Sequence, residues 1–364
     1  MASRLIFPGF IDVHVHFRDP GVPEAETTAS GLRAADRGGF AAVVTMPNTT
    51  PAGDSVEWVR GQLAAAKEGD PTVILPSACI TKGRLGREVA AVEELAEAGA
   101  AFFTDDGTYV TDAKVMEEAM NRIAALNMVV CQHALLPGDG VIRDCPLARR
   151  LGLPVIPASA ETDAIRRDLS LCRETGCRLH VQHISTAEGV ELVRAAQREG
   201  LPVTAEATPH HLLLCCDDLA ADDANFKMAP PLGNREDRAE LRRAVRDGVL
   251  MFATDHAPHP AARKSLGFRA SANGIIGLET AVAITYRVMV EEEGMPVDDW
   301  AKAWYELPKA IVASFGPAAA RRAPRLRNTF VDIGVVRKVD VGAFASLSRN
   351  CPYAGMEFDC WPAV

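Results

Sequence analysis

The sequence repeats one local pattern eight times, and this repeat limits most strongly what the chain can fold into. Each repeat has a short apolar run rich in β-branched residues, a turn containing Gly, Pro, Asn or Asp, and a longer segment of helical periodicity. Strands are expected over 9–17, 41–48, 72–81, 100–104, 128–133, 178–184, 202–207 and 250–255. Helices are expected over 24–37, 55–67, 87–98, 112–126, 161–174, 187–199 and 235–247. Apolar strands that alternate with amphipathic helices predict an α/β fold, and eight such units predict a (β/α)8, TIM-like barrel.

The C-terminal part of the sequence departs from this pattern. Two further helices are expected over 278–293 and 298–315, and the short apolar runs over 331–341 and 343–347 then follow one another without a helix between them. We therefore predict two parts: a barrel of residues 1–316 and a small β appendage of residues 317–364.

Composition narrows the class of partner. The formal net charge is -9, and Lys and Arg are scattered, which argues against binding nucleic acid or an anionic membrane surface. The sequence shows no secretory signal and no apolar run long enough to span a membrane. The nine cysteines form no CxxC pair and lie mostly in apolar segments, as expected of a cytoplasmic protein with reduced thiols. A small molecule is the expected substrate.

A histidine pair ends the first expected strand. His14 and His16 flank Val15, and the two-residue period of a strand points both imidazoles to one face. Neutral imidazole is the commonest zinc ligand, so the pair could bind a metal. Taken alone, it could equally be two core histidines that hydrogen-bond to the backbone.

Other metal-ligating residues follow the carboxyl ends of other expected strands. This is the rim on which (β/α)8 enzymes build their active sites, so residues far apart in sequence meet there. The residues concerned are Asp105, Asp106, His133, His183 and Asp255. Each has an ordinary structural explanation, as a turn residue, a helix cap or a core histidine, but together they indicate one metal site.

The number of candidate metal ligands indicates how many ions the site can hold and which reaction it favours. Four histidines and two carboxylates exceed the needs of one tetrahedral zinc, so one or two ions can be held, two of them through a bridging carboxylate. Such a site favours hydrolysis of an amide. Asp255 is the expected general base, and then the acid that protonates the leaving nitrogen.

Motifs along the chain identify a family. The segment FPGFIDVHVHFRDPG (7–21) resembles the signature of the dihydroorotases, which belong to the cyclic amidohydrolases. Further matching segments occur in family order: GGFAAVVTMPNTTP (38–51), FFTDDG (102–107), HVQHIST (180–186), EATPHHL (206–212), ATDHAPH (253–259) and GIIGLET (274–280). The likeness covers roughly residues 7–316 and continues faintly in SLSRNCPYAGMEF (346–358).

The resemblance implies reversible interconversion of L-dihydroorotate and N-carbamoyl-L-aspartate in de novo pyrimidine biosynthesis. It implies that His14, His16 and Asp255 hold one zinc and that His133 and His183 hold a second. Many relatives carry a carboxylated lysine on strand four, but that segment here contains no lysine. The branch that uses an aspartate bridge therefore fits better, with Asp106 as the bridge and Asp105 as the alternative.

Substrate contacts follow from the same resemblance. Arg18 would clamp the substrate carboxylate with its planar guanidinium, and Asn48 and His259 would add donors. Backbone groups near Asn273 and Gly274 would bind the ring amide, where a residue without Cβ allows close approach. Among the remaining polar residues, His211 and His256 could orient a metal ligand, and Glu206 could either face the barrel interior or make a structural contact.

Some features depart from the family pattern. Only seven residues precede the PGFID run, so we expect the β appendage to consist of the C-terminal piece alone. The stretch KMAPPLG (227–233) and the loop PAARKSLGF (260–268) lack residues that are common in relatives, which leaves substrate fit open there. The alternatives are a hydantoinase or allantoinase, or a silent dihydroorotase-like partner of aspartate transcarbamoylase. A homo-oligomer and a complex of the active enzyme with that transcarbamoylase are also expected.

Overall fold

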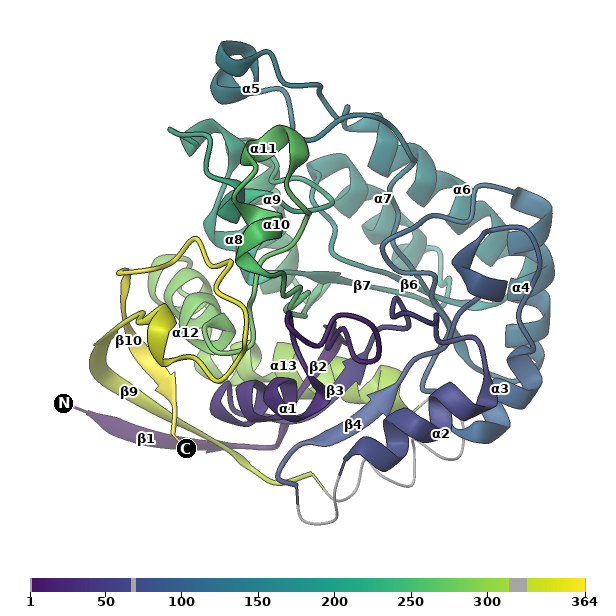
Figure 1. Cartoon of the computed structure of the whole chain (residues 1–364), viewed down its shortest axis with the longest axis horizontal. Helices are drawn as coiled ribbons and strands as arrows, with labels where there is room; N and C mark the ends of the chain where they lie inside the picture. The colour runs from purple at the N-terminus through teal and green to yellow at the C-terminus, as the bar shows by residue number, and fades with distance from the viewer. Residues whose placement is uncertain (1, 67–69, 314–325, 364) are drawn as a thin grey trace.

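The computed structural model describes residues 2–66, 70–313 and 326–363. Its centre is a ring of short parallel strands (Figure 1). One sheet has the order β2 (Phe10–Val15), β3 (Phe40–Thr45) and β4 (Val73–Pro76). The other has the order β5 (Val129–Gln132), β6 (Arg178–Val181), β7 (Val203–Ala207) and β8 (Met251–Phe252). All of these pairings are parallel, which is the arrangement expected from the repeat.

Two narrow seams close the ring into a barrel. At the first seam, Phe103 bridges Ala78 on one side and Val130 on the other, so 100–104 takes the place of the fourth strand without extended pairing. At the second, Val15 bridges His256, and the His16 N–H donates to the His256 carbonyl at 2.9 Å. The predicted (β/α)8 barrel is thus confirmed, with a fourth strand reduced to isolated bridges beside the turn at Asp105.

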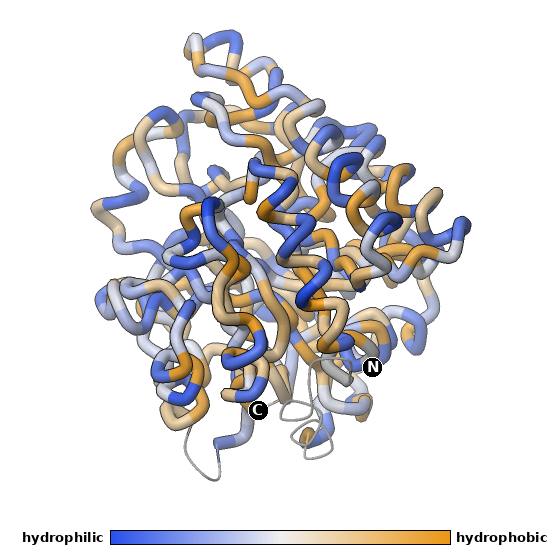
Figure 2. The backbone as a smooth tube through the Cα atoms, turned by 90° about the vertical axis from the view of Figure 1, so that its right-hand side faces the viewer, coloured by the Kyte–Doolittle hydropathy of each residue, from blue (hydrophilic) through white to orange (hydrophobic). Residues whose placement is uncertain are grey.

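The helices lie around the strands. The helices that follow barrel strands are α1 (Thr28–Arg37), α2 (Val56–Ala65), α3 (Val92–Ala98), α4 (Ala113–Ala125), α6 (Ser159–Thr175), α7 (Ala187–Arg198) and α9 (Arg235–Arg246). Side-chain caps begin several of them, for example Thr27, Asp112 and Asn234. Figure 2 shows hydrophobic and hydrophilic residues alternating along these outer helices. A helix with this pattern packs its hydrophobic face against the barrel and exposes its hydrophilic face to solvent.

The remaining helices complete the chain. Short helices in the loops are α5 (Pro146–Leu151), α8 (Pro209–Leu213), α10 (Ala261–Lys264) and α11 (Gly267–Ala270). The expected helical pair appears as α12 (Ala281–Thr285), which continues into a π-helix (Tyr286–Glu292), and α13 (Val297–Ala313). Trp300 and Trp304 of α13 pack against Phe10 with ring centroids 5.6 and 6.3 Å away. None of the described helices is long and apolar enough to span a membrane.

The small β appendage differs from the sequence expectation. It is an antiparallel sheet of β1 (Ser3–Phe7), β9 (Thr329–Lys338) and β10 (Glu357–Pro362), so it takes a strand from each end of the chain (Figure 1). The expectation of a purely C-terminal appendage was wrong because Leu5 pairs with Val331 and Phe7 is buried against Phe10. The run 343–347 forms no strand, and the predicted boundary between 316 and 317 lies outside the described residues.

Candidate active site

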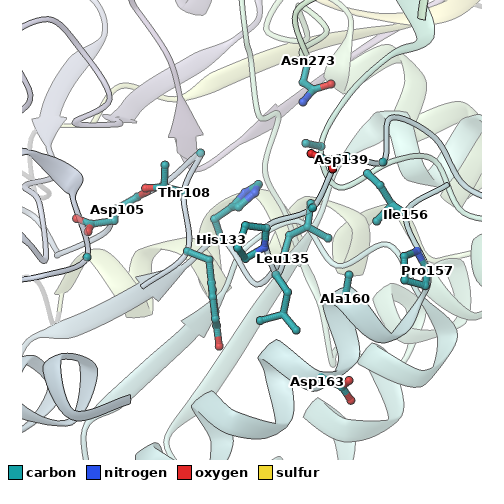
Figure 3. Close-up of a pocket in the computed structure, with 18 of the residues that line it drawn as sticks. Asp105, Thr108, His133, Leu135, Asp139, Ile156, Pro157, Ala160, Asp163 and Asn273 are labelled. Atoms are coloured by element: carbon teal, nitrogen blue, oxygen red, sulfur yellow. The ribbon is translucent and has the colours of Figure 1, made fainter. Parts of the chain in front are cut away.

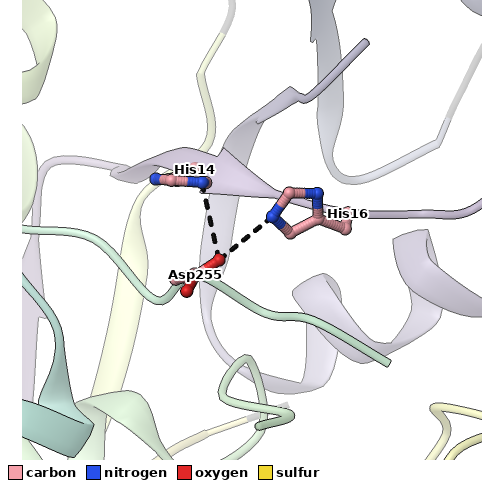
Figure 4. A group of neighbouring side chains, drawn as sticks. All are labelled: His14, His16 and Asp255. Carbon is pink, nitrogen blue, oxygen red and sulfur yellow. Dashed lines mark hydrogen bonds and ion pairs between the residues drawn. The ribbon is translucent and has the colours of Figure 1, made fainter. Parts of the chain in front are cut away.

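His14 and His16, at the end of β2, meet Asp255 at the carboxyl end of the barrel. His16 Nε2 lies 3.0 Å from Asp255 Oδ1, and His14 Nε2 lies 3.5 Å from the same oxygen (Figure 4). All three residues are buried. The pairing register between β2 and β3 shifts between Asp12 and Val15, and such a bulge re-aims side chains at an active site. It lets Ile11 and Val13 join the apolar barrel interior below the histidines.

The carboxylate of Asp106 lies between two histidine pairs. Its Oδ1 is 3.3 Å from His14 Nε2, and its Oδ2 is 3.3 Å from His16 Nε2. On its other side, His133 Nδ1 and His183 Nε2 are each 3.7 Å from Oδ1 and 2.9 Å from one another. The structure therefore brings together all six residues that the sequence analysis selected as metal ligands.

Asp105 faces away from this cluster although it is the neighbour of Asp106. Its Oδ1 accepts the backbone N–H groups of Ile80 at 2.9 Å and Thr81 at 3.1 Å, and its Oδ2 accepts the Thr81 hydroxyl. This carboxylate fixes the loop after β4. Of the two alternatives, only Asp106 has the position of a bridging group.

Strained backbone places several site residues. Five described residues other than glycine have positive φ, and three of them belong to the predicted site: Arg18 at 55°, His183 at 31° and Asp255 at 47°. A left-handed conformation costs side-chain-bearing residues free energy, so it persists where the surroundings enforce it.

Glu206 is the main residue whose role sequence reasoning left undecided. It is fully buried, and its Oε1 lies 2.6 Å from His14 Nδ1 while its Oε2 lies 2.9 Å from His180 Nε2. Oε1 also accepts the backbone N–H of His183 at 3.1 Å. A carboxylate on the far nitrogen of a histidine fixes the tautomer that leaves Nε2 able to bind a metal. Alternation along β7 turns Glu206 to the face opposite Ala205 and Ala207, and this was the only sequence signal.

The electrostatics of the cluster suit a cation. Burial alone would raise the pKa of Asp106, yet His14 and His16 hold it well below its usual value. Burial would lower the pKa of His14, but Asp106, Glu206 and Asp255 raise it well above its usual value. His14 Nε2 and Asp106 Oδ1 are buried and make no hydrogen bond, although they face each other. Two overlapping ligand sets share His14: one adds His16 and Asp255, the other Asp106 and His183.

The predicted substrate residues lie on one side of this cluster. Arg18 forms no ion pair with any described carboxylate, and its Nη2 is 3.5 Å from His259 Nε2. Asn48 uses its Oδ1 to accept from His16 Nδ1 at 2.8 Å, so it orients a histidine as well as lining the pocket. His259 Nε2 lies 2.7 Å from the carbonyl of Asn273.

The backbone of Gly274 has partners inside the protein. Its N–H donates to the Lys227 carbonyl at 2.9 Å, and its carbonyl accepts from Lys264 and Asn350. These groups hold the loop, and the neighbouring Asn273 is exposed and lines the pocket. The φ of Gly274 is +144°, and a Cβ there would lie 2.7 Å from the Ala257 carbonyl oxygen.

The cluster opens into a cavity of about 370 Å³ that Arg18, Asn48, His259 and Asn273 help to line. A second cavity of about 690 Å³ adjoins it, and the two share Gly107, His133, Ala229 and Asn273. Figure 3 shows His133 in this second cavity beside Leu135. Together they leave space for a small molecule beside the histidines and carboxylates.

Comparisons with known proteins agree with this geometry. A family model described as dihydro-orotase-like matches residues 3–189. Dihydroorotase from Bacillus caldolyticus is 43% identical over 370 residues, which cover 100% of this chain and 86% of the relative. Dihydroorotase from Halalkalibacterium halodurans is 40% identical over 376 residues, which cover 100% of this chain and 85% of the relative.

Solved structures share the fold. L-hydantoinase from Arthrobacter aurescens superposes with a TM-score of 0.84 at 24% identity, covering 99% of this chain and 83% of that one. Dihydroorotase from Saccharomyces cerevisiae, in complex with 5-fluoroorotic acid, gives a TM-score of 0.77 at 17% identity, with 99% and 98% covered. At these identities the likeness shows the barrel fold.

Proposed function

This chain belongs to the dihydroorotase family and is a cyclic amidohydrolase, and from that premise we propose that the cluster around Asp106 carries its reaction. The reaction interconverts L-dihydroorotate and N-carbamoyl-L-aspartate in pyrimidine biosynthesis. The observation that carries the proposal is the position of the Asp106 carboxylate, within 3.7 Å of nitrogen atoms from four histidines.

We assign the metal ligands from these contacts. One ligand set consists of His14, His16 and Asp255. The second consists of His133 and His183, and the Asp106 carboxylate lies between the two sets. The set would take one or two zinc ions, since imidazole and carboxylate are ordinary zinc ligands. When bound, zinc makes a water molecule more acidic and polarises the amide carbonyl.

Asp255 is the proposed general base. It contacts His14 and His16 through Oδ1 alone. Neighbouring histidines lower its pKa despite burial, so it is ionised at neutral pH. In hydrolysis it takes the proton of the attacking water and returns it to the ring nitrogen as the C–N bond breaks. In the reverse direction the same carboxylate removes that proton from the carbamoyl nitrogen.

Arg18 is the proposed anchor for the substrate carboxylate. Burial lowers its pKa to about 10, which leaves the guanidinium charged at neutral pH. A charged group that lines the pocket and forms no ion pair with a described carboxylate is suited to an anionic substrate. This favours a ring with a carboxylate over the hydantoin or allantoin alternatives.

The experiment compares L-dihydroorotate with 5,6-dihydrouracil, the same ring without its carboxylate. We expect the protein to prefer dihydroorotate, and Arg18→Ala to raise KM for it by roughly ten- to a hundred-fold, the value of a hydrogen-bonded charge. Arg263→Ala is the matched control, because Arg263 lines the same cavity. Better turnover of dihydrouracil than of dihydroorotate by the unaltered protein would refute the assignment.

We also propose a cytoplasmic location, a homo-oligomer, and association with aspartate transcarbamoylase. All nine cysteines are buried and unpaired, which supports a reducing compartment. Gel filtration of the purified chain, alone and with the transcarbamoylase, tests the assembly.

A further inference from the structure

We propose that Asn350, which lies in the segment after β9, is a positioning residue for the carboxylate side of the substrate pocket. This inference rests on the proposed function and extends it to a part of the chain outside the barrel. Asn350 belongs to the stretch 344–353, which forms neither helix nor strand, and it is only 3% exposed.

Every polar group of the Asn350 side chain contacts the backbone of an active-site loop. Its Nδ2 donates to the carbonyls of Ala257 at 2.9 Å and Gly274 at 3.0 Å. Its Oδ1 accepts the N–H of His259 at 3.1 Å. The partner set, two carbonyls and one N–H, matches the two donors and the acceptor of an amide. Asn350 thus joins the loop after Asp255 to the loop that carries Gly274.

The backbone of Asn350 adds to this connection. Its carbonyl accepts the N–H of Ile276 at 3.1 Å, two residues beyond Gly274. A buried lysine, Lys264, supports the same loop by donating to the carbonyls of Lys227, Ala272 and Gly274 at 3.1, 3.0 and 2.8 Å. The Gly274 carbonyl is therefore shared by Lys264 and Asn350.

These contacts end on the residues that face the substrate carboxylate. His259, whose N–H bonds to Asn350, lies beside Arg18 and the carbonyl of Asn273. The metal ligands are held differently, by Glu206 and by the barrel strands. Loss of Asn350 should therefore disturb substrate binding more than metal binding, because it releases the backbone that holds His259 beside Arg18.

The same segment makes a second contact near the site. Ser346 donates its hydroxyl to Glu26, and the Leu347 N–H donates to Glu26 at 3.3 Å. Glu26 Oε2 lies 3.3 Å from Nε2 of His256, the residue after Asp255. The C-terminal segment therefore reaches the loop of Asp255 in two ways, directly through Asn350 and indirectly through Glu26, although it follows the barrel in sequence.

The test measures KM and kcat for L-dihydroorotate in Asn350→Asp and Asn350→Ala, with metal content and thermal unfolding on the same preparations. Asn350→Asp keeps the acceptor for His259 but places an oxygen against two carbonyls, whereas Asn350→Ala only removes the contacts. Ser348→Ala is the matched control, because Ser348 is equally buried in this segment but donates to Ala25 instead.

We expect both Asn350 variants to raise KM for dihydroorotate by roughly ten- to a hundred-fold, the value of a hydrogen bond to a charged group, with metal content and kcat near those of the unaltered protein. KM for dihydrouracil, which has no carboxylate, should change little. An unchanged KM in a folded Asn350→Ala variant, or an equal rise in Ser348→Ala, would overturn the inference. If the unaltered protein fails to hydrolyse dihydroorotate, the proposed function itself is wrong and the inference falls with it.

Discussion

Replacing Glu206 with glutamine isolates the effect of one buried charge on the proposed metal centre. Burial opposes ionisation of Glu206, but His14 and His180 lower its pKa to about 2, so it is a carboxylate at neutral pH. Glutamine has nearly the same shape and can still accept from His14 Nδ1 and the His183 N–H. It loses the negative charge and places an NH2 group where Oε2 now faces His180.

The expected loss of zinc affinity in Glu206→Gln follows from these contacts. A hydrogen bond to a charged group contributes about 1.5–3 kcal/mol and a neutral one about 0.5–1.5 kcal/mol. Losing the charge opposite His14 therefore costs about 1–2 kcal/mol, and the partner of a metal-bound histidine is typically worth 10- to 100-fold in metal affinity. We expect Glu206→Gln to bind zinc roughly ten-fold more weakly or worse.

The assay is competition for zinc with a chelator of known affinity, followed by measurement of dihydroorotate turnover at saturating zinc. Glu240→Gln is the control, because Glu240 is also a buried, ion-paired carboxylate but pairs with Arg194 and Arg243 on the outer helices. Glu240→Gln should lower stability without changing zinc affinity. If Glu206→Gln binds zinc as tightly as the unaltered protein, the claim that Glu206 sets the tautomer of His14 is wrong.

Three further outcomes are expected. Asp255→Asn should lower kcat by roughly 100-fold or more, since general acid–base catalysis contributes that much, and steady-state kinetics check it. Gly274→Ala should raise KM and lower the melting temperature because its Cβ would meet the Ala257 carbonyl, whereas Gly61→Ala, with open space at its Cβ and no positive φ, should not lower the melting temperature. Burial raises the pKa of Asp168 to about 6, so the native state holds this proton more tightly than the unfolded state and loses that advantage as pH rises from 4 to 6. The free energy of unfolding of Asp168→Asn, measured in urea, should therefore rise by up to about 3 kcal/mol relative to that of the unaltered protein between pH 4 and pH 7. Parallel plots of unfolding free energy against pH for the two proteins would contradict this.

Much of the barrel was predictable because its strands are local features. The strands that lead to His14, His133 and Asp255 are mostly apolar, and alternation with Val129 and Cys131 places His133 on the inner face. His14 reaches that face through the register shift in β2 rather than by strict alternation. The fourth strand was predicted at 100–104, but only Phe103 pairs there. A run that short carries too little pattern to distinguish a strand from a bridge.

The choice between Asp105 and Asp106 could not be made from spacing. Both follow the same apolar run, and alternation loses its meaning once the chain turns. The structure separates them through the loop of Thr81, whose backbone and hydroxyl occupy the Asp105 carboxylate. The positive φ values of His183 and Asp255 had no sequence signal either, because neither residue is a glycine.

Contacts across long separations explain the remaining differences. Strand β1 was not predicted as part of the appendage, since its partner β9 lies more than 300 residues later. Asn350 is separated by 93 positions from Ala257 and by 76 from Gly274. No local pattern marks a single amide whose partners are backbone groups that far away.

The most direct test of the metal-dependent dihydroorotase account measures zinc content and dihydroorotate turnover on the same preparation before chelation, after chelation and after zinc is returned. We predict that turnover disappears with the metal and returns with it. Asp105→Asn should recover turnover in the same way, whereas Asp106→Asn should hold less zinc and stay inactive. Full turnover by metal-free protein, or none by zinc-loaded protein, would contradict the account.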